Sequence, residues 1–289
     1  MNRPLVIYHG SCDDGHGAAY VLWLLFKGEA DYWAAYYGDP VPDTTGRAVY
    51  IVDFSYDKDN INKILDTCES LVWLDHHKTS VDLMYDIKAL NNPKATIVAD
   101  NKRSGARMAF DYVMDNLIQN YPDKKDHLAA REVFINYIQD NDLWTFELPE
   151  SKEFSLALRS EKMTFDIWDT LDANALMESG RAMKKFFDNK IAEVCKLAYE
   201  KDIFGHKVKV ANCNGMFASD VGHELAKDAP FSLTWWYDGR RKKFVFSMRS
   251  SDTGLDVGEL AKNVGGGGHA RAAGFQLDPS AVDEILDIE

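Results

Sequence analysis

Three short apolar runs in the first hundred residues each lead directly into a residue that could carry chemistry. The runs and the residues that follow them are Leu5–Tyr8 with His9, Ala48–Val52 with Asp53, and Leu71–Leu74 with Asp75. Short continuous apolar runs are typical of strands that are buried on both faces. Helical patterns such as Asn60–Cys68 lie between these runs, so the sequence predicts a parallel sheet flanked by helices.

Chemistry in such open sheets collects at the carboxyl ends of the strands. Carboxylates grouped at one edge repel each other unless a cation lies among them. Mixed carboxylate and imidazole ligands suit Mn²⁺, Fe²⁺ or Mg²⁺ better than a structural zinc site. Two such ions about 3.5–4 Å apart can clamp a phosphate and generate a hydroxide. The candidate metal ligands lie in four stretches: His9 with Asp13 and Asp14, Asp53, Asp75-His76-His77, and Asp140 with Asp142.

Several of these residues also have an ordinary structural interpretation. Asp13 or Asp14 could cap the helix that is predicted to follow them. Asp53 could be a solvated carboxylate at the end of a strand, and Asp142 could be a turn residue. Cys12 is interpreted as a packed thiol.

The chain changes character near residue 205. Ala173–Tyr199 has the pattern of a long helix, whereas Phe231–Tyr237 and Lys243–Met248 predict a hairpin that turns at Asp238-Gly239. We expect residues 1–185 to form a catalytic metal-binding domain, residues 186–205 a linker and helix end, and residues 206–289 a smaller α/β substrate-binding domain.

A glycine-rich motif stands near the C-terminus, where four consecutive glycines from Gly265 lead into His269. Glycines let the backbone approach a ligand closely and expose amide N–H groups to an anion. Arg249 ends a predicted strand and could make a bidentate contact with a phosphate. The candidate substrate-binding residues are Arg249, Gly266, Gly267, Gly268, His269 and Arg271.

The composition limits the kinds of binding partner and the cellular compartments that we expect for this protein. The net charge is −13 over 289 residues, which argues against a protein that coats long nucleic acid. No apolar run approaches the roughly 20 residues of a membrane span, and the N-terminus lacks the pattern of a signal peptide. The four cysteines show no paired spacing, so we expect reduced thiols in a cytoplasmic protein.

Taken together, the motifs resemble the DHH phosphoesterase superfamily with a DHHA1 C-terminal domain. The resemblance covers nearly the whole chain, and within the superfamily it is greatest to the small NrnB-type oligoribonucleases and nucleotide phosphodiesterases. It rests on His9 with Asp13-Asp14, on Asp53, on Asp75-His76-His77, on Asp140-Asn141-Asp142-Leu143-Trp144 and on Gly265–Phe275. One departure is that the family usually has Asp-x-Asp where this chain has adjacent Asp13 and Asp14.

The resemblance implies a particular set of ligands. One metal would be held by His9, Asp13 and Asp53, and the other by Asp14, Asp53, His76 and Asp140, with Asp53 bridging the two. Asp75 and His77 would either bind a metal directly or orient His76 and contact the phosphate. The choice between Asp140 and Asp142 stays open, and the shortened first motif affects the ligands of the first metal.

The function that follows is hydrolysis of short oligonucleotides or dinucleotides to nucleoside monophosphates. The expected cofactor is a pair of Mn²⁺ ions, with Mg²⁺ or Co²⁺ as alternatives, and the expected active site is a cleft between the two domains. Partners would be the short substrate and, as an option, a second copy in a homodimer, without long duplex nucleic acid or a membrane. The alternatives are a cyclic mono- or dinucleotide phosphodiesterase, a single-strand exonuclease and an inactive nucleotide-binding module.

Overall fold

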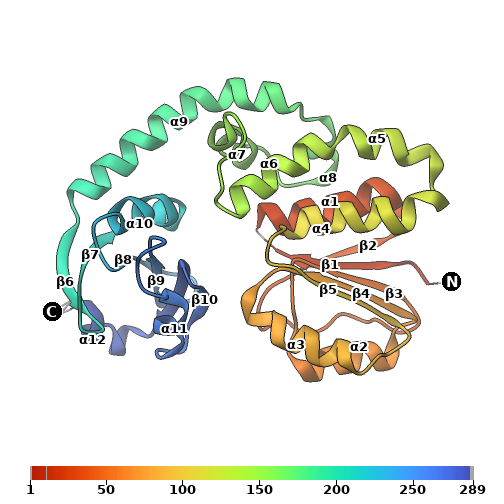
Figure 1. The fold of residues 1–289 in the computed structure, drawn as a ribbon, viewed down its shortest axis with the longest axis horizontal. Helices are drawn as coiled ribbons and strands as arrows, with labels where there is room; N and C mark the ends of the chain where they lie inside the picture. The colour runs from red at the N-terminus through yellow and green to blue at the C-terminus, as the bar shows by residue number, and fades with distance from the viewer. Residues whose placement is uncertain (1, 11, 287–289) are drawn as a thin grey trace. The chain divides into compact units, whose positions relative to one another are not determined.

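A computed structural model describes residues 2–10 and 12–286 of the chain. The chain divides into two compact units, Met1–Lys184 and Lys185–Glu289. The long helix α9 (Ala173–Lys196) crosses the boundary between them, so residues 186–205 hold the end of that helix and the strand that follows it. Figure 1 shows the elements of both units.

The first unit is built on a parallel sheet with the strand order β2-β1-β3-β4-β5. Its strands are β1 (Leu5–His9), β2 (Asp31–Ala35), β3 (Ala48–Val52), β4 (Ser70–Asp75) and β5 (Ala95–Ala99). Its helices before α9 are α1 (Asp13–Phe26), α2 (Lys58–Thr67), α3 (Lys78–Ala89), α4 (Gly105–Tyr112), α5 (Lys125–Ala130), α6 (Glu132–Asp142), α7 (Ser151–Ser160) and α8 (Phe165–Thr170).

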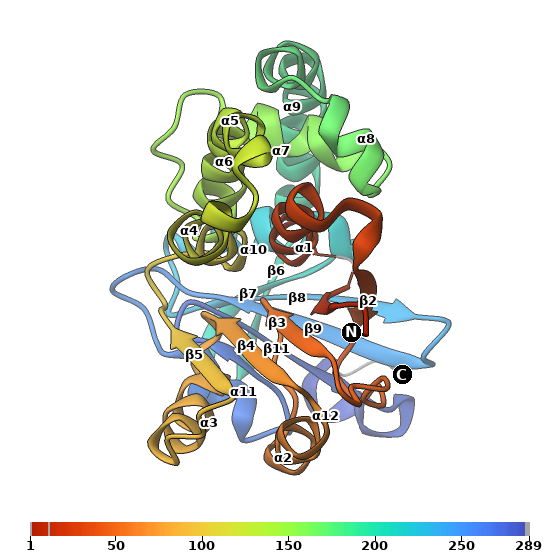
Figure 2. The same cartoon turned by 90° about the vertical axis from the view of Figure 1, so that its right-hand side faces the viewer.

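Helices cover both faces of this sheet, with α1 and α4 on one side and α2 and α3 on the other (Figures 1 and 2). Successive strand residues point to opposite faces of the sheet, so each strand contributes side chains to the hydrophobic cores on both faces. In β4, Val72 and Leu74 pack toward α1 and α4, whereas Leu71 and Trp73 pack toward α2. Burial on both faces explains the continuous apolar runs in the sequence, and the predicted α/β class is confirmed.

The second unit contains a six-stranded sheet of mixed direction with the order β10-β11-β9-β8-β7-β6. Its elements are β6 (Tyr199–Ile203), β7 (His206–Asn212), α10 (Ala218–Ala226), β8 (Ser232–Asp238), β9 (Lys243–Arg249), α11 (Val257–Lys262), β10 (Gly267–His269), β11 (Ala272–Leu277) and α12 (Asp283–Leu286). Strands β8 and β9 form the predicted antiparallel hairpin. One face of the sheet packs against α11 and α12, and the other packs against α10 and the end of α9.

Several predicted elements differ from those observed. The sequence pattern of residues 104–118 predicts one helix that is capped by Ser104. The cap is present, but α4 ends at Tyr112 and a wider π-helical turn, Val113–Leu117, follows. The sequence pattern of residues 128–139 likewise predicts a single helix, but Arg131 separates α5 from α6. The predicted glycine loop contains a strand, β10, because Gly267–His269 pairs with β11.

Candidate metal centre

The three strand-end residues of the sequence motif meet at one edge of the first sheet. His9 ends β1, Asp75 ends β4, and Asp53 follows β3 directly. The parallel register brings these ends level, since Val52 pairs with residues at the ends of both neighbouring strands. Strand order also reverses beside β1, because β2 lies on one side of it and β3 on the other. A reversal of this kind is where open α/β sheets bind ligands.

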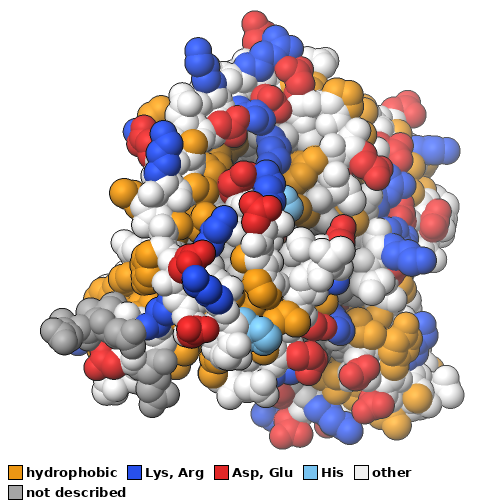
Figure 3. Space-filling model, turned by 60° about the vertical axis from the view of Figure 1, so that its left-hand side comes forward, with side chains coloured by type: hydrophobic (Ala, Val, Ile, Leu, Met, Phe, Trp, Pro, Cys, Tyr) orange, Lys and Arg blue, Asp and Glu red, His pale blue; other side chains and the backbone are white. Residues whose placement is uncertain are grey.

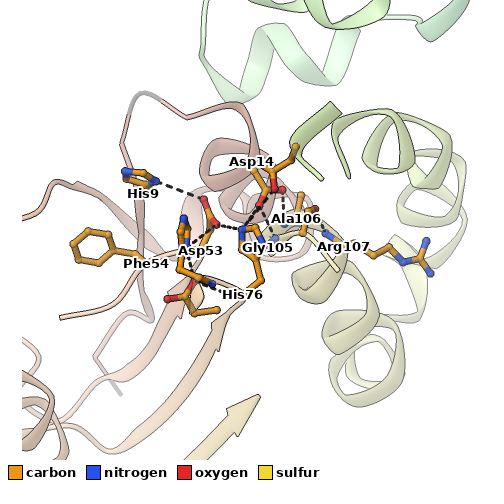
Figure 4. Close-up of polar contacts among 12 residues, drawn as sticks. His9, Asp14, Asp53, Phe54, His76, Gly105, Ala106 and Arg107 are labelled. Atoms are coloured by element: carbon orange, nitrogen blue, oxygen red, sulfur yellow. Dashed lines mark hydrogen bonds and ion pairs between the residues drawn. The ribbon is translucent and has the colours of Figure 1, made fainter. Parts of the chain in front are cut away.

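Asp53 lies at the centre of the cluster (Figure 4). It is 1% exposed, and its backbone has a φ of +54°, which a non-glycine residue rarely adopts. Its Oδ1 lies 3.1 Å from His76 Nε2, and its Oδ2 lies 3.8 Å from His9 Nδ1. Burial opposes ionisation, but the imidazoles of His76, His9 and His77 lower the pKa of Asp53 below its ordinary value. Backbone strain at a buried carboxylate is a feature of functional sites.

Two buried atoms of this cluster form no hydrogen bond within the described protein. They are Asp53 Oδ2 and His9 Nδ1. A buried carboxylate oxygen without a donor costs free energy unless another group, such as a cation, satisfies it. The residues present therefore fit a bound metal ion.

Asp14 joins the cluster from the first turn of α1. Its two oxygens accept hydrogen bonds from the backbone N–H groups of Gly105 and Ala106, at 2.5 and 2.9 Å, where α4 begins. Its Oδ2 also lies 3.6 Å from His76 Nε2. Burial, together with the nearby carboxylates of Asp142 and Asp53, raises the pKa of Asp14 well above its ordinary value. Asp14 is thus a crowded carboxylate that favours a compensating cation.

The close approach of α4 to these carboxylates requires glycine at its first position. A Cβ atom on Gly105 would collide with the Cβ of Asp53 and would lie 3.0 Å from Asp14 Oδ2. The N-terminus of α4 therefore reaches the cluster directly, and its amides favour negative charge there.

Asp75 orients the two histidines that follow it. Its Oδ1 accepts hydrogen bonds from the backbone N–H groups of His76 and His77, at 2.8 and 3.2 Å, and lies 2.7 Å from His77 Nδ1. Its Oδ2 accepts a hydrogen bond of 2.5 Å from Ser55 Oγ. These contacts account for both oxygens of a carboxylate that is fully buried. The geometry favours an orienting role for Asp75 over direct metal binding.

The two histidines are held among acids, which favours their protonated forms when no metal is bound. Burial alone would lower the pKa of His76, but Asp53, Asp142 and Asp14 raise it to about 10. Burial likewise opposes protonation of His77, whereas its contact with Asp75 raises its pKa. A proton on His76 is then the charge that a metal ion would replace.

The structure distinguishes Asp140 from Asp142. Asp140 turns toward the loop after α6, where its Oδ1 accepts hydrogen bonds from Thr145 Oγ1 at 2.7 Å and Glu147 N at 2.8 Å. Its Oδ2 accepts one from Leu148 N at 3.2 Å. Asp142 Oδ2 instead lies 3.6 Å from His76 Nε2. The prediction had placed Asp140 among the ligands and favoured a turn role for Asp142, whereas the structure brings Asp142 to the cluster and uses Asp140 to hold a loop.

The electrostatics of Asp142 agree with its position. Removal from water raises its pKa to about 6, with the attraction of His76 opposing the shift and the charge of Asp53 adding to it. About a quarter of its side chain remains exposed to solvent, so this carboxylate borders both the cluster and the surface.

Asp13 is paired with an arginine rather than with the residues of the cluster. Its Oδ2 forms an ion pair of 2.8 Å with Arg159 Nε on α7. The adjacent Cys12 lies near His9 and Asp53 instead. Burial and the carboxylates of Asp53, Asp142 and Asp14 raise the pKa of the Cys12 thiol well above its usual value.

Among the described residues, three groups of side chains could hold a metal ion, each with its ligand atoms within 4.8 Å of one another. The groups are His9–Cys12–Asp53, Asp53–His76–His77 and Asp14–His76–Asp142. Asp53 belongs to two of them and His76 to two, so the groups form one linked set. Cys12 and Asp142 are the members that were absent from the ligand set implied by the resemblance. The sequence offered Asp142 as the alternative to Asp140, whereas Cys12 had been interpreted as a packed thiol.

In the second unit, the two candidate substrate-binding arginines donate hydrogen bonds to neighbouring residues of the protein. Arg249 donates hydrogen bonds to Ser247 Oγ, Ser219 Oγ and the carbonyl of Met248, and burial lowers its pKa to about 10. Arg271 donates to the carbonyls of residues 252, 254 and 255, which fixes the loop before α11.

The glycines of the C-terminal motif also have structural reasons. A Cβ on Gly266 would collide with the Gly274 carbonyl, and Gly268 has a φ of +142° against β11. Gly267 and His269 lie on β10, where His269 is exposed. The close packing of β10 against β11 thus explains why glycines are needed at Gly266 and Gly268. That the C-terminal glycine motif contacts substrate stays a prediction.

Comparisons with known proteins agree with this architecture. The DHHA1 domain model matches residues 223–288. An uncharacterized protein, R106, of Acanthamoeba polyphaga mimivirus is 26% identical over 94% of this chain, and the oligoribonuclease NrnB of Bacillus subtilis is 23% identical over 83% of it. The alignments span 66% and 61% of these relatives' own lengths.

A solved structure supports the same fold. An exopolyphosphatase-related protein from Bacteroides fragilis superposes with a TM-score of 0.54 at 12% identity, covering 96% of this chain and 87% of that one. Residues 223–288 match the DHHA1 domain, and the chain as a whole resembles proteins of the DHH superfamily, as its motifs predicted. Its sequence is similar to NrnB-type members of that superfamily.

Proposed function

We propose that this protein is a divalent-metal-dependent phosphodiesterase that hydrolyses short oligonucleotides or dinucleotides to nucleoside monophosphates. The observation that carries the proposal is the linked set of ligand groups, which share Asp53 and His76. Three buried or half-buried carboxylates crowd around these residues, and they repel each other unless cations lie among them. The similarity to the B. subtilis oligoribonuclease supports the choice of substrate class.

The ligand groups suggest which residues would hold each of two metal ions. His9 and Asp53 would hold one ion, and Asp14, Asp53, His76 and Asp142 the other. Two divalent cations, when bound, supply the charge that activates water and stabilises the phosphate as it reacts. Asp75 fixes the ring of His77 through its Nδ1 contact, so that the other ring nitrogen can donate a proton to a phosphate oxygen.

A small hollow lies beside these ligands, within the first unit. It measures about 60 Å³, and its lining includes Cys12, Asp13, Asp14 and Asp142 as well as Arg159 of α7. Ligand pockets in proteins typically measure roughly 300–1,000 Å³, so this hollow has room for only a small part of a substrate, such as one phosphate group.

An exposed aromatic ring favours a substrate that carries a base. Tyr37 follows β2 and is 61% exposed, and its ring lies 5.6 Å from that of His9 and 5.2 Å from that of Phe54. Aromatic rings beside phosphate sites stack bases without regard to sequence. Inorganic polyphosphate has no base that could stack on this ring, so the position of Tyr37 favours a nucleotide as the substrate.

The charge distribution favours short substrates. Residues 206–289 carry a net charge of −2, and the preceding residues carry −11. On the face drawn in Figure 3, acidic and basic side chains are interspersed. Each phosphate beyond the metal ions would therefore meet a negative or neutral surface, so longer strands would add repulsion rather than affinity.

The test is turnover by the purified protein with Mn²⁺ across dinucleotides, oligomers up to about twenty nucleotides, and cyclic mono- and dinucleotides. We expect kcat/KM to be highest for substrates of two to about five nucleotides, with Asp53→Ala inactive as the control. A kcat/KM that rises steadily with length would support an exonuclease instead. Preference for cyclic substrates would support the cyclic-nucleotide alternative, and no turnover at all would support a binding module.

A further inference from the structure

Cys12 occupies a ligand position in the first group. Its Sγ lies with a nitrogen of His9 and an oxygen of Asp53, and the three atoms are within 4.8 Å of one another. Cys12 is the residue immediately before α1, with extended backbone angles of φ −124° and ψ +133°. The chain therefore turns into the helix at this residue, and Cys12 and Asp13 face different surroundings.

The neighbouring Asp13 cannot fill the same position as it stands. Its carboxylate pairs with Arg159 at 2.8 Å and belongs to none of the ligand groups. Cys12 and Asp14, two residues apart, are the members of this loop that belong to ligand groups. The residue between them, Asp13, is the one that pairs with Arg159.

An independent observation indicates that a ligand belongs between these side chains. Asp53 Oδ2 is buried, faces His9 Nδ1 at 3.8 Å and forms no hydrogen bond within the described protein. His9 Nδ1 is likewise buried and forms none. A separation of 3.8 Å is too long for a hydrogen bond, but it suits two atoms that bind the same ion.

We propose that Cys12 Sγ is a metal ligand and completes, with His9 and Asp53, a site that prefers Zn²⁺ or Co²⁺ over Mn²⁺. Binding would transfer the thiol proton to solvent and form a metal–sulfur bond. The inference rests on the metal-dependent function proposed above. Thiolate is a soft ligand that selects such ions, whereas the Asp14–His76–Asp142 group offers only oxygen and nitrogen and suits Mn²⁺. The two ion sites would then differ in metal preference.

The experiment compares the metal-stripped wild type with Cys12→Ser and with Cys195→Ser, which removes a thiol of the second unit. Each protein is titrated with Co²⁺ while near-ultraviolet thiolate-to-cobalt absorption is recorded. Alkylation of Cys12 by iodoacetamide is followed by mass spectrometry with and without Zn²⁺. We expect the cobalt band in wild type and Cys195→Ser, its loss in Cys12→Ser, and a Zn²⁺ affinity at least roughly tenfold weaker in Cys12→Ser.

Two results would overturn the proposal. One is a cobalt band, or a Zn²⁺ affinity, that Cys12→Ser retains within about twofold. The other is alkylation of Cys12 at the same rate with and without Zn²⁺. A Cys12→Asp variant guards against a folding artefact, since it should bind Mn²⁺ better than Zn²⁺ if the position is a ligand. Failure of wild type to bind any divalent ion would instead defeat the proposed function itself.

Discussion

Replacing Asp140 and Asp142 separately by alanine should produce opposite effects. Asp140 accepts three hydrogen bonds that hold the loop after α6. Hydrogen bonds to a charged acceptor contribute roughly 1.5–3 kcal/mol each, and the abandoned donors can partly find water. We therefore expect Asp140→Ala to lower the free energy of unfolding by about 3 kcal/mol while leaving the metal ligands in place.

Asp142→Ala should instead stabilise the metal-free protein at high pH. The pKa of Asp142 is raised from 3.8 to about 6, so the folded state holds its proton more tightly than the unfolded state does. Above pH 6 the carboxylate is charged in both states and its burial opposes folding. A shift of this size corresponds to a cost of up to about 3 kcal/mol. Below pH 3.8 both states are protonated and the cost disappears.

The assay is urea unfolding of both variants in chelator at pH 8 and pH 4, together with dinucleotide turnover in Mn²⁺. We expect Asp142→Ala to gain stability at pH 8, to gain much less at pH 4, and to lose roughly 100-fold or more in kcat, because a metal ligand is gone. Asp140→Ala should lose stability but retain turnover while it is folded. A stable, inactive Asp140→Ala beside a fully active Asp142→Ala would refute this assignment.

Three further predictions concern other parts of the site. Asp53→Ala should abolish turnover and weaken the binding of both metal ions, measured by metal content after dialysis. A variant that keeps a tenth of the wild-type kcat would show that Asp53 does not serve both ions. Gly105→Ala should lower the melting temperature and activity together, because its Cβ would collide with Asp53; an unchanged melting curve would contradict the close approach of α4. His269→Ala should raise KM for dinucleotides with kcat and metal content unchanged; loss of bound metal would place His269 in the metal centre instead.

The strands and their terminal ligands were predictable because parallel strands in register end at the same edge. The residues after the apolar runs, His9, Asp53 and Asp75, therefore had to meet. What was not predictable is which side chain of a close pair faces inward. Asp140 and Asp142 lie two residues apart on a helix, about 200° around its axis, so they face nearly opposite directions.

Non-local pairing explains the other differences. Glycine disfavours strands, so the sequence of Gly267 and Gly268 indicated a loop. Their strand forms because β11 lies alongside, and this contact has no local sequence signal. Helix breaks at Arg131 and after Tyr112 likewise depend on packing, which overrides helix propensity.

We propose above that the linked ligand groups hold two divalent ions and that these ions support hydrolysis of a short nucleotide. The most direct measurement is Mn²⁺ titration of chelator-stripped protein, with bound ions per chain and dinucleotide turnover followed in the same samples. We predict no turnover without metal and a recovery that rises as two ions bind per chain. Full turnover in the stripped protein, or recovery without bound ions, would contradict the account.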